Sequence, residues 1–363
     1  MKDGKKIIFV TGQSGIEKDK IVESVYAQIP EAEKPFHVGK RLCRELGAKK
    51  GKVLQKDIEE IRLARKGVMN EIKHEISQSR KRIFLVNTHM CFRWRGKGFF
   101  FAFDFDQIKE FGISGFMTVI DDFDLVKTRL QARRFQDRRY PVFSLKDIVI
   151  WREEEFIVTE AISKFFKIDH FIVPRKNALE IITDLICNPK KKKCYASFPM
   201  SHAKPSEEKE ITAFIDRMKQ RFVVFDPSAL QEKMKLTRKF LPRVQKKRLK
   251  SISIGKVDRR QVRVPVYDLQ AIESDIDSQI QSQDFKLIRQ SNIVVAYVPS
   301  WGKRPLRSDG STIEMRQAYK EGKEVHLIWR ASGKPSPWLD YDYKHASLDA
   351  FLDWLEKHGC RVQ

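Results

Sequence analysis

The chain has 363 residues, 41% of them hydrophobic and 33% charged, values typical of a globular protein long enough for two domains. It has no apolar run near the ~20 residues of a membrane span and no secretory signal at its start, so we expect a cytoplasmic protein without a membrane partner. Five scattered cysteines favour neither a disulfide framework nor a metal site. The formal net charge of +23 indicates either polyanionic partners, a nucleotide or a nucleic acid, or a solvated basic surface.

The first part of the chain alternates apolar, strand-like runs with amphipathic, helix-like stretches, as a parallel α/β sheet requires. Helices are expected over 53–81 and 145–167. Strands are expected over 6–12, 82–89, 116–124 and 170–177. The run "NPKKKK" at 188–193 combines a proline with a block of charge and predicts a basic linker after a first domain, 1–187.

A second alternation follows in the predicted domain 194–363 and indicates a smaller doubly wound, Rossmann-like sheet. Strands are expected over 193–200, 221–227, 292–299 and 324–329, and helices over 206–220, 268–291 and 311–322. The basic stretch 240–265 interrupts this pattern. We interpret it as a surface insertion of the second domain, with binding of a polyanion as the alternative.

The first expected strand runs into "GQSGIEKDK" and then into a helix, the setting in which backbone N–H groups and a helix N-terminus hold phosphates. The candidate phosphate-binding residues of this loop are Gly12, Gly15, Lys18 and Asp19. Glycine-rich turns between a strand and a helix also occur for packing reasons, so the loop alone is a moderate signal.

Further along, "LVNTHMCFRWRGKGFFFAFD" and "FMTVIDDFDLVKTRLQARRFQDRRY" resemble archaeal-type adenylate kinases and related P-loop nucleoside monophosphate kinases, in which a strand ends in Asp-Thr-His and a later strand leads to an arginine-rich lid. The resemblance implies that Lys18 contacts the transferring phosphates, that Thr88 and His89 stand in the Asp-Thr-His position, and that ATP and Mg²⁺ are the cofactors. It also implies a lid whose charge comes from Arg129, Arg133, Arg134, Arg138 and Arg139.

Three residues depart from what phosphoryl transfer needs. A transferase holds Mg²⁺ with a loop Ser/Thr and a strand-end aspartate, but this chain has Asp19 and Asn87 at those positions. Glu17 adds a Cβ and a negative charge beside the phosphates, which opposes binding by about 1 kcal/mol or more. We therefore expect a domain that binds a nucleotide and transfers phosphate weakly or not at all.

In the second domain, the segment 308–314, with Ser308, Gly310 and Glu314, follows a strand, and Asp284 lies on the helix before that strand. Together with "KCYASFPM", these residues resemble the nucleoside 2-deoxyribosyltransferase superfamily, and in particular its 2′-deoxynucleoside 5′-monophosphate N-hydrolases. Asn292 replaces a second aspartate of the family pattern, and Ser197 occupies its usual glycine position.

The resemblance implies a catalytic set of Glu314 as nucleophile, Asp284 as proton donor to the departing base, and Tyr195 as the residue that orients Glu314 by a hydrogen bond. A carboxylate can trap the oxocarbenium-like state of such a cleavage, and a carboxyl with a raised pKa suits the proton transfer. The implied substrate phosphate site consists of Ser197, Ser308, Gly310 and Ser311. This chemistry requires no metal or cofactor.

These observations favour a nucleotide N-glycosidase, either a hydrolase or a transferase, that carries a degenerate kinase-like domain. The alternatives are an active nucleoside monophosphate kinase, an effector that cleaves NAD in defence, and a non-catalytic regulator that binds nucleotides or nucleic acid. Related glycosidase folds complete their pockets across a dimer interface, so we expect a homo-oligomer.

Overall fold

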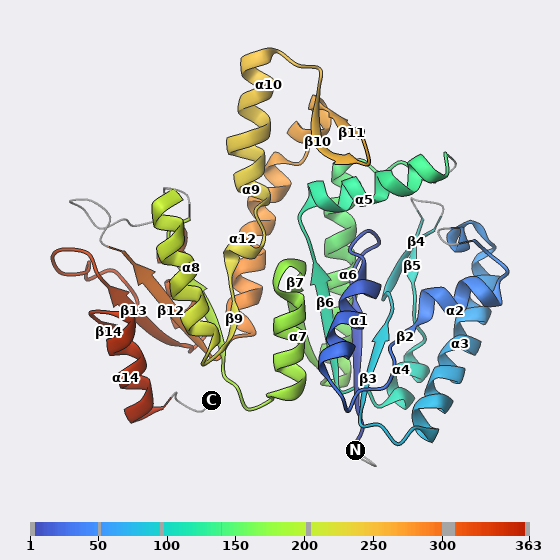
Figure 1. Ribbon diagram of the computed structural model, residues 1–363, viewed down its shortest axis with the longest axis horizontal. Helices are drawn as coiled ribbons and strands as arrows, with labels where there is room; N and C mark the ends of the chain where they lie inside the picture. The colour runs from blue at the N-terminus through green and yellow to red at the C-terminus, as the bar shows by residue number, and fades with distance from the viewer. Residues whose placement is uncertain are drawn as a thin grey trace. The chain divides into compact units, whose positions relative to one another are not determined.

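The computed structural model describes residues 4–49, 52–94, 98–138, 140–200, 205–299 and 309–359. It divides the chain into two compact units (Figure 1). The first unit comprises Met1–Thr183 and Gln231–Ile276, and the second comprises Asp184–Leu230 and Asp277–Gln363. None of the helices in the described ranges combines the length and hydropathy that a membrane span needs.

The first unit is built on a five-stranded sheet in the order β2-β3-β1-β6-β7, with all neighbours parallel. The strands are β1 (Lys6–Thr11), β2 (Phe36–His37), β3 (Ile83–Asn87), β6 (Gly115–Ile120) and β7 (Asp169–Pro174). Every residue of β6 is buried, as expected of a central strand covered on both faces. The predicted parallel α/β class is confirmed.

Helices of the first unit begin and end at recognisable signals. Asp57 caps α3 by accepting hydrogen bonds from the N–H groups of Glu59 and Glu60, and Ser144 with Asp147 forms a capping box at the start of α6. The helices are α1 (Lys18–Gln28), α2 (Val38–Glu45), α3 (Ile58–Gln78), α4 (Phe105–Phe111), α5 (Phe123–Gln136), α6 (Leu145–Phe166) and α7 (Ala178–Cys187). An antiparallel hairpin joins β4 (Cys91–Trp94) to β5 (Gly98–Phe101), and short 3₁₀ turns cover Val53–Gln55 and Arg175–Asn177.

Residues 231–276, called here the accessory segment, belong to the first unit and not to the second as the sequence suggested for 240–265. Arg152 Nη1 donates to Glu232 Oε1 at 2.7 Å, and both side chains are at most 3% exposed. Buried charge of this kind must be paired, and its partner here lies on α6. The segment contains α9 (Glu232–Met234), a π-helix (Lys235–Phe240), α10 (Leu241–Lys247), the hairpin β10 (Ser251–Val257) and β11 (Arg260–Pro265), and α11 (Val266–Gln270).

The second unit has its own five-stranded parallel sheet, in the order β14-β13-β12-β8-β9. The strands are β8 (Lys193–Ser197), β9 (Val223–Phe225), β12 (Ile293–Val298), β13 (Glu324–Trp329) and β14 (Tyr343–His345). The helices are α8 (Pro205–Lys219), α12 (Glu273–Arg289, which belongs to this unit from Asp277 on), α13 (Asp309–Lys320) and α14 (Leu348–His358), with a 3₁₀ turn at Pro227–Ala229. The helix expected over 268–291 is interrupted after Gln270, so α11 and α12 are separate.

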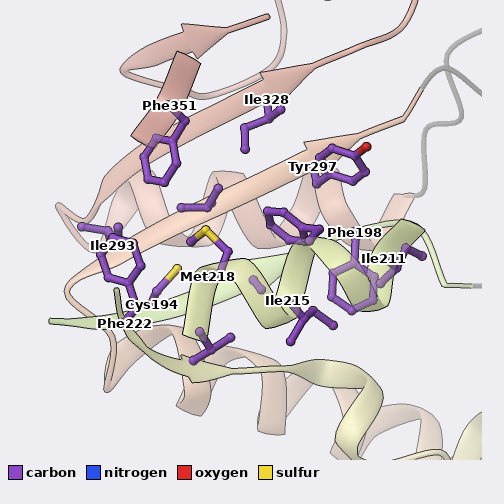
Figure 2. Packing of buried hydrophobic residues seen from close by; sticks show 14 residues of the cluster. Cys194, Phe198, Ile211, Ile215, Met218, Phe222, Ile293, Tyr297, Ile328 and Phe351 are labelled. Carbon is purple, nitrogen blue, oxygen red and sulfur yellow. The ribbon is translucent and has the colours of Figure 1, made fainter. Parts of the chain in front are cut away.

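The core of the second unit lies between the sheet and the helices α8 and α14 (Figure 2). Met218 of α8 is fully buried against this sheet, and the rings of Phe214 and Tyr297 stack with centroids 4.9 Å apart. Phe351 brings α14 into the same cluster. This packing fixes β8 and β12 side by side, which matters for the residues at their ends.

Candidate functional sites

In open α/β sheets, ligands bind outside the carboxyl ends of strands where the strand order reverses. In the first unit this point is β1, because the chain builds β3 and β2 on one side of it and β6 and β7 on the other. In the second unit it lies at β8, between β9 and β12. The residues predicted for the first unit follow β1, and those predicted for the second unit surround the end of β8. Each set therefore lies where its own sheet favours a binding site.

The glycines of the first loop are required by packing. Gly12 has φ +130°, and a Cβ there would lie 2.4 Å from the carbonyl oxygen of Val119 in β6. Gly15 has φ +92°, and a Cβ there would lie 3.1 Å from side-chain atoms of Val126 and Leu130 in α5. These two glycines therefore let the loop lie against β6 and α5, and they do not by themselves indicate a phosphate.

Glu17, in the position where a phosphate loop has glycine, keeps the left-handed conformation with φ +60° and ψ +43°. A residue with a Cβ adopts it at a cost of roughly 1–2 kcal/mol. Its carboxylate lies 2.6 Å from Lys20 Nζ, 2.9 Å from Arg175 Nη2 and 3.5 Å from Arg129 Nε. Burial raises the pKa of Glu17, but these three positive charges outweigh burial and lower it overall. The charge expected to repel phosphates is thus compensated, which corrects one argument made from the sequence.

Lys18 is only 5% exposed, and its Nζ donates to the carbonyl of Gly12 and lies 3.4 Å from His89 Nε2. Burial lowers the pKa of Lys18 to about 8, against the opposing charge of Glu155. The lysine is therefore folded back onto its own loop, close to the end of β3.

Glu155 of α6 is fully buried and organises this loop, although nothing in the sequence analysis singled it out. Its carboxylate accepts hydrogen bonds from the backbone N–H groups of Gly12 at 3.1 Å, Met90 at 2.9 Å and Cys91 at 3.1 Å. The signal was available, because helical spacing places Glu155 on the apolar face of α6 with Trp151.

A cavity of about 390 Å³ opens beside the loop, within the usual range for ligand pockets. Of the predicted residues, Gly15, Lys18, Asp19, Thr88, His89 and Arg133 line it. Lys40, Arg65 and Arg93 also line it and were not predicted. Cationic side chains thus outnumber the acidic ones, Glu17 and Asp19, around a cavity that suits an anionic ligand.

Most of the predicted lid arginines have other roles. Arg129 Nη1 donates to Asp121 Oδ2 at 2.6 Å and to the carbonyl of Gly15 at 3.0 Å. This α5 side chain therefore holds the glycine-containing loop in place. Arg134 Nη1 donates to the carbonyl of Tyr140 at 2.6 Å. Arg138 is exposed and does not line the cavity, and Arg139 lies outside the described residues. Arg133 is the predicted lid arginine that faces the cavity.

Arg65 of α3 is a buried cation that the sequence analysis missed. Its Nη2 donates to Thr88 Oγ1 at 3.0 Å and to the carbonyl of His89 at 3.3 Å. Burial lowers the pKa of Arg65 to about 10, with the charge of Glu155 acting in the opposite direction. Its place on the apolar face of α3, four residues after Ile61, was the signal that could have identified it.

The residues around the loop do not fit a magnesium ion. Asn87 Nδ2 lies 3.1 Å from His37 Nδ1, so the residue at the strand-end position is an amide engaged with a histidine. The nearby carboxylate of Asp121 is taken by Arg129. The part of the chain that the structure describes holds no group of three or more His, Cys, Asp or Glu side chains arranged to bind a metal.

In the second unit, the structure brings the predicted catalytic residues together from three elements. Tyr195 lies on β8, Asp284 on α12 and Glu314 on α13, and Ser197, predicted to bind phosphate, ends β8. The hydroxyl of Ser197 donates to Glu314 Oε2 at 2.5 Å, and both residues are buried. The side chain expected to hold a phosphate therefore positions Glu314 instead.

Tyr195 lies fully buried on β8, next to both carboxyls. Burial raises the pKa of its hydroxyl well above the usual value, and the charges of Asp284 and Glu314 raise it further. Its hydroxyl lies near enough to Asp284 and Glu314 for hydrogen bonding to lower the pKa of each, while Ser197 makes the 2.5 Å hydrogen bond that orients Glu314.

The two carboxyls share one partly enclosed environment, and this determines their protonation. Burial raises the pKa of Asp284 to about 8, helped by the charge of Glu314. Burial also raises the pKa of Glu314, while hydrogen bonding to Ser197 and Tyr195 opposes the rise. The two carboxyls therefore titrate as a coupled pair that holds a proton to higher pH than either isolated side chain would.

The remaining predicted residues divide between this site and other places. Gly310 and Ser311 lie in the first turn of α13, one turn before Glu314, while Ser308 lies outside the described residues. Asn292 lies at the amino end of β12, where its Oδ1 accepts a hydrogen bond from the N–H of Lys193 at 2.9 Å. Asn292, the residue that differs from the family pattern, therefore links β12 to β8 by a hydrogen bond, at the opposite end of the sheet from Ser197.

A polar cluster at the carboxyl ends of β12 and β13 was not predicted. Arg330 Nη1 donates to Glu210 Oε1 at 2.6 Å and to the hydroxyl of Tyr297 at 3.1 Å, and Tyr297 in turn donates to Glu210. Burial raises the pKa of Tyr297 to about 12, and its bond to Glu210 adds to the rise. The cluster lies at the same edge of the sheet as Ser197.

Fold and sites together define a chain of two parallel-sheet α/β units, one with a basic cavity beside a glycine-containing loop and one with a buried carboxyl pair. No family model and no curated protein matches the chain. Among solved structures it is similar to the shikimate kinase from Acinetobacter baumannii in complex with shikimate, at 15% identity and a TM-score of 0.36, over 52% of this chain and 96% of that one.

Two other solved structures show likenesses of the same order. The shikimate kinase from Bacteroides thetaiotaomicron is 10% identical, with a TM-score of 0.34 over 50% of this chain and 98% of that one. The tunicamycin resistance protein of Deinococcus radiodurans is 13% identical, with a TM-score of 0.30 over 45% of this chain and 96% of that one. These scores carry no argument about activity, so the function proposed for this chain rests on its own residues.

Proposed function

We propose that the second unit is a nucleotide N-glycosidase that removes the base from a 2′-deoxynucleoside 5′-monophosphate or a related nucleotide. The observation that carries the proposal is the carboxyl pair: Asp284 and Glu314 lie close together near the carboxyl end of β8, and the pKa of each is raised. A carboxyl with a raised pKa beside a second carboxyl is the arrangement that cleavage of a glycosidic bond uses, with one as proton donor and the other as nucleophile.

Each carboxyl then has one task. An oxygen of Glu314 attacks C1′ of the sugar, and the bond between C1′ and the base nitrogen breaks with its electron pair passing to the base. Asp284 supplies the proton that the departing base takes up. Water, or a second base, then displaces Glu314 from C1′ and returns a proton to Asp284.

Ser197 and the first turn of α13 support this chemistry. The hydroxyl of Ser197 holds Glu314 in one orientation, so the attacking oxygen is fixed before the substrate binds. The N–H groups of Gly310 and Ser311 lie at the N-terminus of α13, where the helix dipole favours a 5′-phosphate.

We further propose that the first unit binds a nucleotide and transfers phosphate weakly or not at all. Lys18, Arg65 and Arg133 around the 390 Å³ cavity supply cationic donors for phosphate oxygens. Among the described residues that follow β3 and β6, Asn87 is an amide engaged with His37 and the carboxylate of Asp121 is engaged with Arg129, so these two positions do not supply the ligand that Mg²⁺ needs. This combination favours binding over catalysis.

The experiment that tests the proposal is a base-release panel read by chromatography. The intact protein is incubated with deoxynucleoside monophosphates, ribonucleotides and NAD, and, in a parallel arm, with ATP and nucleoside monophosphates. We expect free base from at least one nucleotide, no base release by Glu314→Ala, and little ADP in the parallel arm.

Glu321→Gln is the matched control, because this carboxyl lies just beyond the far end of α13. It should release base at the wild-type rate. Release that persists in a folded Glu314→Ala variant would disprove the glycosidase assignment, and efficient phosphate transfer that disappears in Lys18→Ala would disprove the assignment of the first unit.

A further inference from the structure

The accessory segment turns its apolar side chains inward and its basic ones outward. In the hairpin, Ile252, Ile254, Val262 and Val264 are buried against the first unit. The outward positions and the turn carry the exposed cations Lys256, Arg259 and Arg263, whereas Arg260, in phase with Val262, places its guanidinium over the ring of Phe135 in α5. The period-two pattern of the strands therefore builds a basic outer face on the hairpin.

Helix α10, which precedes the hairpin along the chain, repeats this arrangement. Val244 is buried, whereas Lys246, Lys247 and Arg248 are exposed at the end of the helix. Arg248 ends α10 in the left-handed conformation, with φ +47°, and β10 begins at Ser251. A connection this short keeps the end of α10 within about 14 Å of the start of β10. The outward cations of α10 and of the hairpin thus follow one another along one segment; together Lys246–Arg248, Lys256, Arg259 and Arg263 are called here the basic face.

The charge of the basic face is not neutralised locally. Between Lys235 and Pro265 the sequence contains a single acidic residue, Asp258. Within the described ranges, no ion pair joins Lys246, Lys247 or Arg248 to a carboxylate. A surface that is merely solvated usually mixes both signs of charge, and this one does not.

The segment is held firmly on the first unit, so the basic face is presented at a fixed orientation. Besides the buried pair of Arg152 and Glu232, Lys235 Nζ lies 2.6 Å from Asp122 Oδ2 and 3.0 Å from Asp124 Oδ1. At the other end of the segment, Asp268 accepts a hydrogen bond from the N–H of Leu145 at 3.1 Å. Buried ion pairs and hydrogen bonds of this kind cost free energy to form, and a loosely attached basic tail would not need them.

We propose that the basic face binds the phosphodiester backbone of a nucleic acid. Exposed Arg and Lys side chains on a hairpin and a helix end supply the positive charge and the hydrogen-bond donors that backbone phosphates bind. A membrane surface is the less suitable partner, because the apolar side chains of the hairpin point inward and offer no anchor to insert among lipids. This binding is separate from the carboxyl pair and does not depend on the glycosidase proposal.

The test is fluorescence anisotropy with labelled 20-nucleotide single-stranded DNA, duplex DNA and RNA, measured over a series of salt concentrations with the full chain. We expect binding by at least one of them, with an affinity that falls steeply with salt. The variant with Lys246→Gln, Lys247→Gln and Arg248→Gln should bind at least about 10-fold more weakly, and the salt slope should fall by about 2 because each lost phosphate contact removes about 0.7–0.9.

The chain offers a matched control in Arg80, Lys81 and Arg82, which are also three consecutive exposed cations of the first unit. Their combined change to glutamine removes the same charge and should alter binding less than about 3-fold. An equal loss in both variants would mean that net charge alone attracts the nucleic acid, and would overturn the proposal. Absence of binding at low salt, or binding to anionic vesicles but to none of the nucleic acids, would also overturn it.

Discussion

The buried carboxyl pair makes the stability of the second unit depend on pH, and Asp284→Asn tests this directly. Burial and the charge of Glu314 raise the pKa of Asp284 from 3.8 to about 8. Between these values the folded chain keeps a proton that the unfolded chain has released, so the free energy of unfolding falls as the pH rises from about 4 to 8. Asparagine does not titrate, so the variant should lack this loss.

The size of the effect follows from the shift. One pKa unit corresponds to about 1.4 kcal/mol, so even half of the rise from 3.8 to about 8 lowers the free energy of unfolding by about 3 kcal/mol across this pH range. In hydrogen exchange, where protection follows the opening free energy, about 3 kcal/mol is a factor of about 100.

The assay is hydrogen exchange followed by mass spectrometry on peptides from β8 and α13, which reports the second unit separately from the first. Wild type and Asp284→Asn are compared at pH 5 and again at pH 8.5, so that the intrinsic exchange rate cancels. Because the unfolded chain has already released most of the proton at pH 5, about two thirds of this effect remains, and the protection of wild type relative to the variant should fall about 30-fold between the two pH values.

Asp277→Asn, two helical turns earlier on α12 and exposed, is the control and should show no such change. Parallel pH profiles for wild type and Asp284→Asn would refute the reasoning, because they would mean that Asp284 titrates alike in the folded and unfolded chain.

Three further predictions concern the first unit. Gly12→Ala should lower the stability of this unit by more than about 2 kcal/mol, since its Cβ would lie 2.4 Å from the carbonyl of Val119; a melting temperature within 2 °C of wild type would contradict the tight contact. Glu232→Gln should destabilise the unit by about 3 kcal/mol and increase hydrogen exchange in β10 and β11, because it leaves Arg152 buried without its ionised partner; unchanged exchange there would mean that the ion pair does not hold the segment. Lys18→Met should weaken nucleotide binding at least about 10-fold by isothermal calorimetry with little change in stability, and equal affinity would place the nucleotide elsewhere.

The sequence predicted the sheets well and the grouping of segments poorly. The strands β1, β3, β6 and β7 are long apolar runs and were identified, whereas β2, with Phe36–His37 alone, is too short to show any period. The accessory segment was assigned to the second unit because it follows that unit's first strands along the chain. Its buried pair joins Arg152 to Glu232, and a contact between residues so distant in sequence leaves no local signal.

The candidate sites, too, were predicted in part from the sequence. The motif order correctly brought Asp284 and Glu314 to one place, because strand ends in a parallel sheet meet at one edge. Which hydroxyl bonds to Glu314 depends on side-chain positions of a few ångströms, and the hydrogen bond from Ser197 was not predicted. Arg65 could have been recognised as a charged residue on an apolar helix face.

The central claim is that Glu314 attacks the sugar, and the most direct measurement is the mass of the α13 peptide after rapid quenching of wild type and Glu314→Gln with the nucleotide that the base-release panel identifies. We expect the wild-type peptide to gain the mass of a deoxyribose phosphate, or of the corresponding sugar phosphate, and the variant to gain none and to release no base. Base release at the wild-type rate by a folded Glu314→Gln variant, with its peptide unmodified, would contradict the claim.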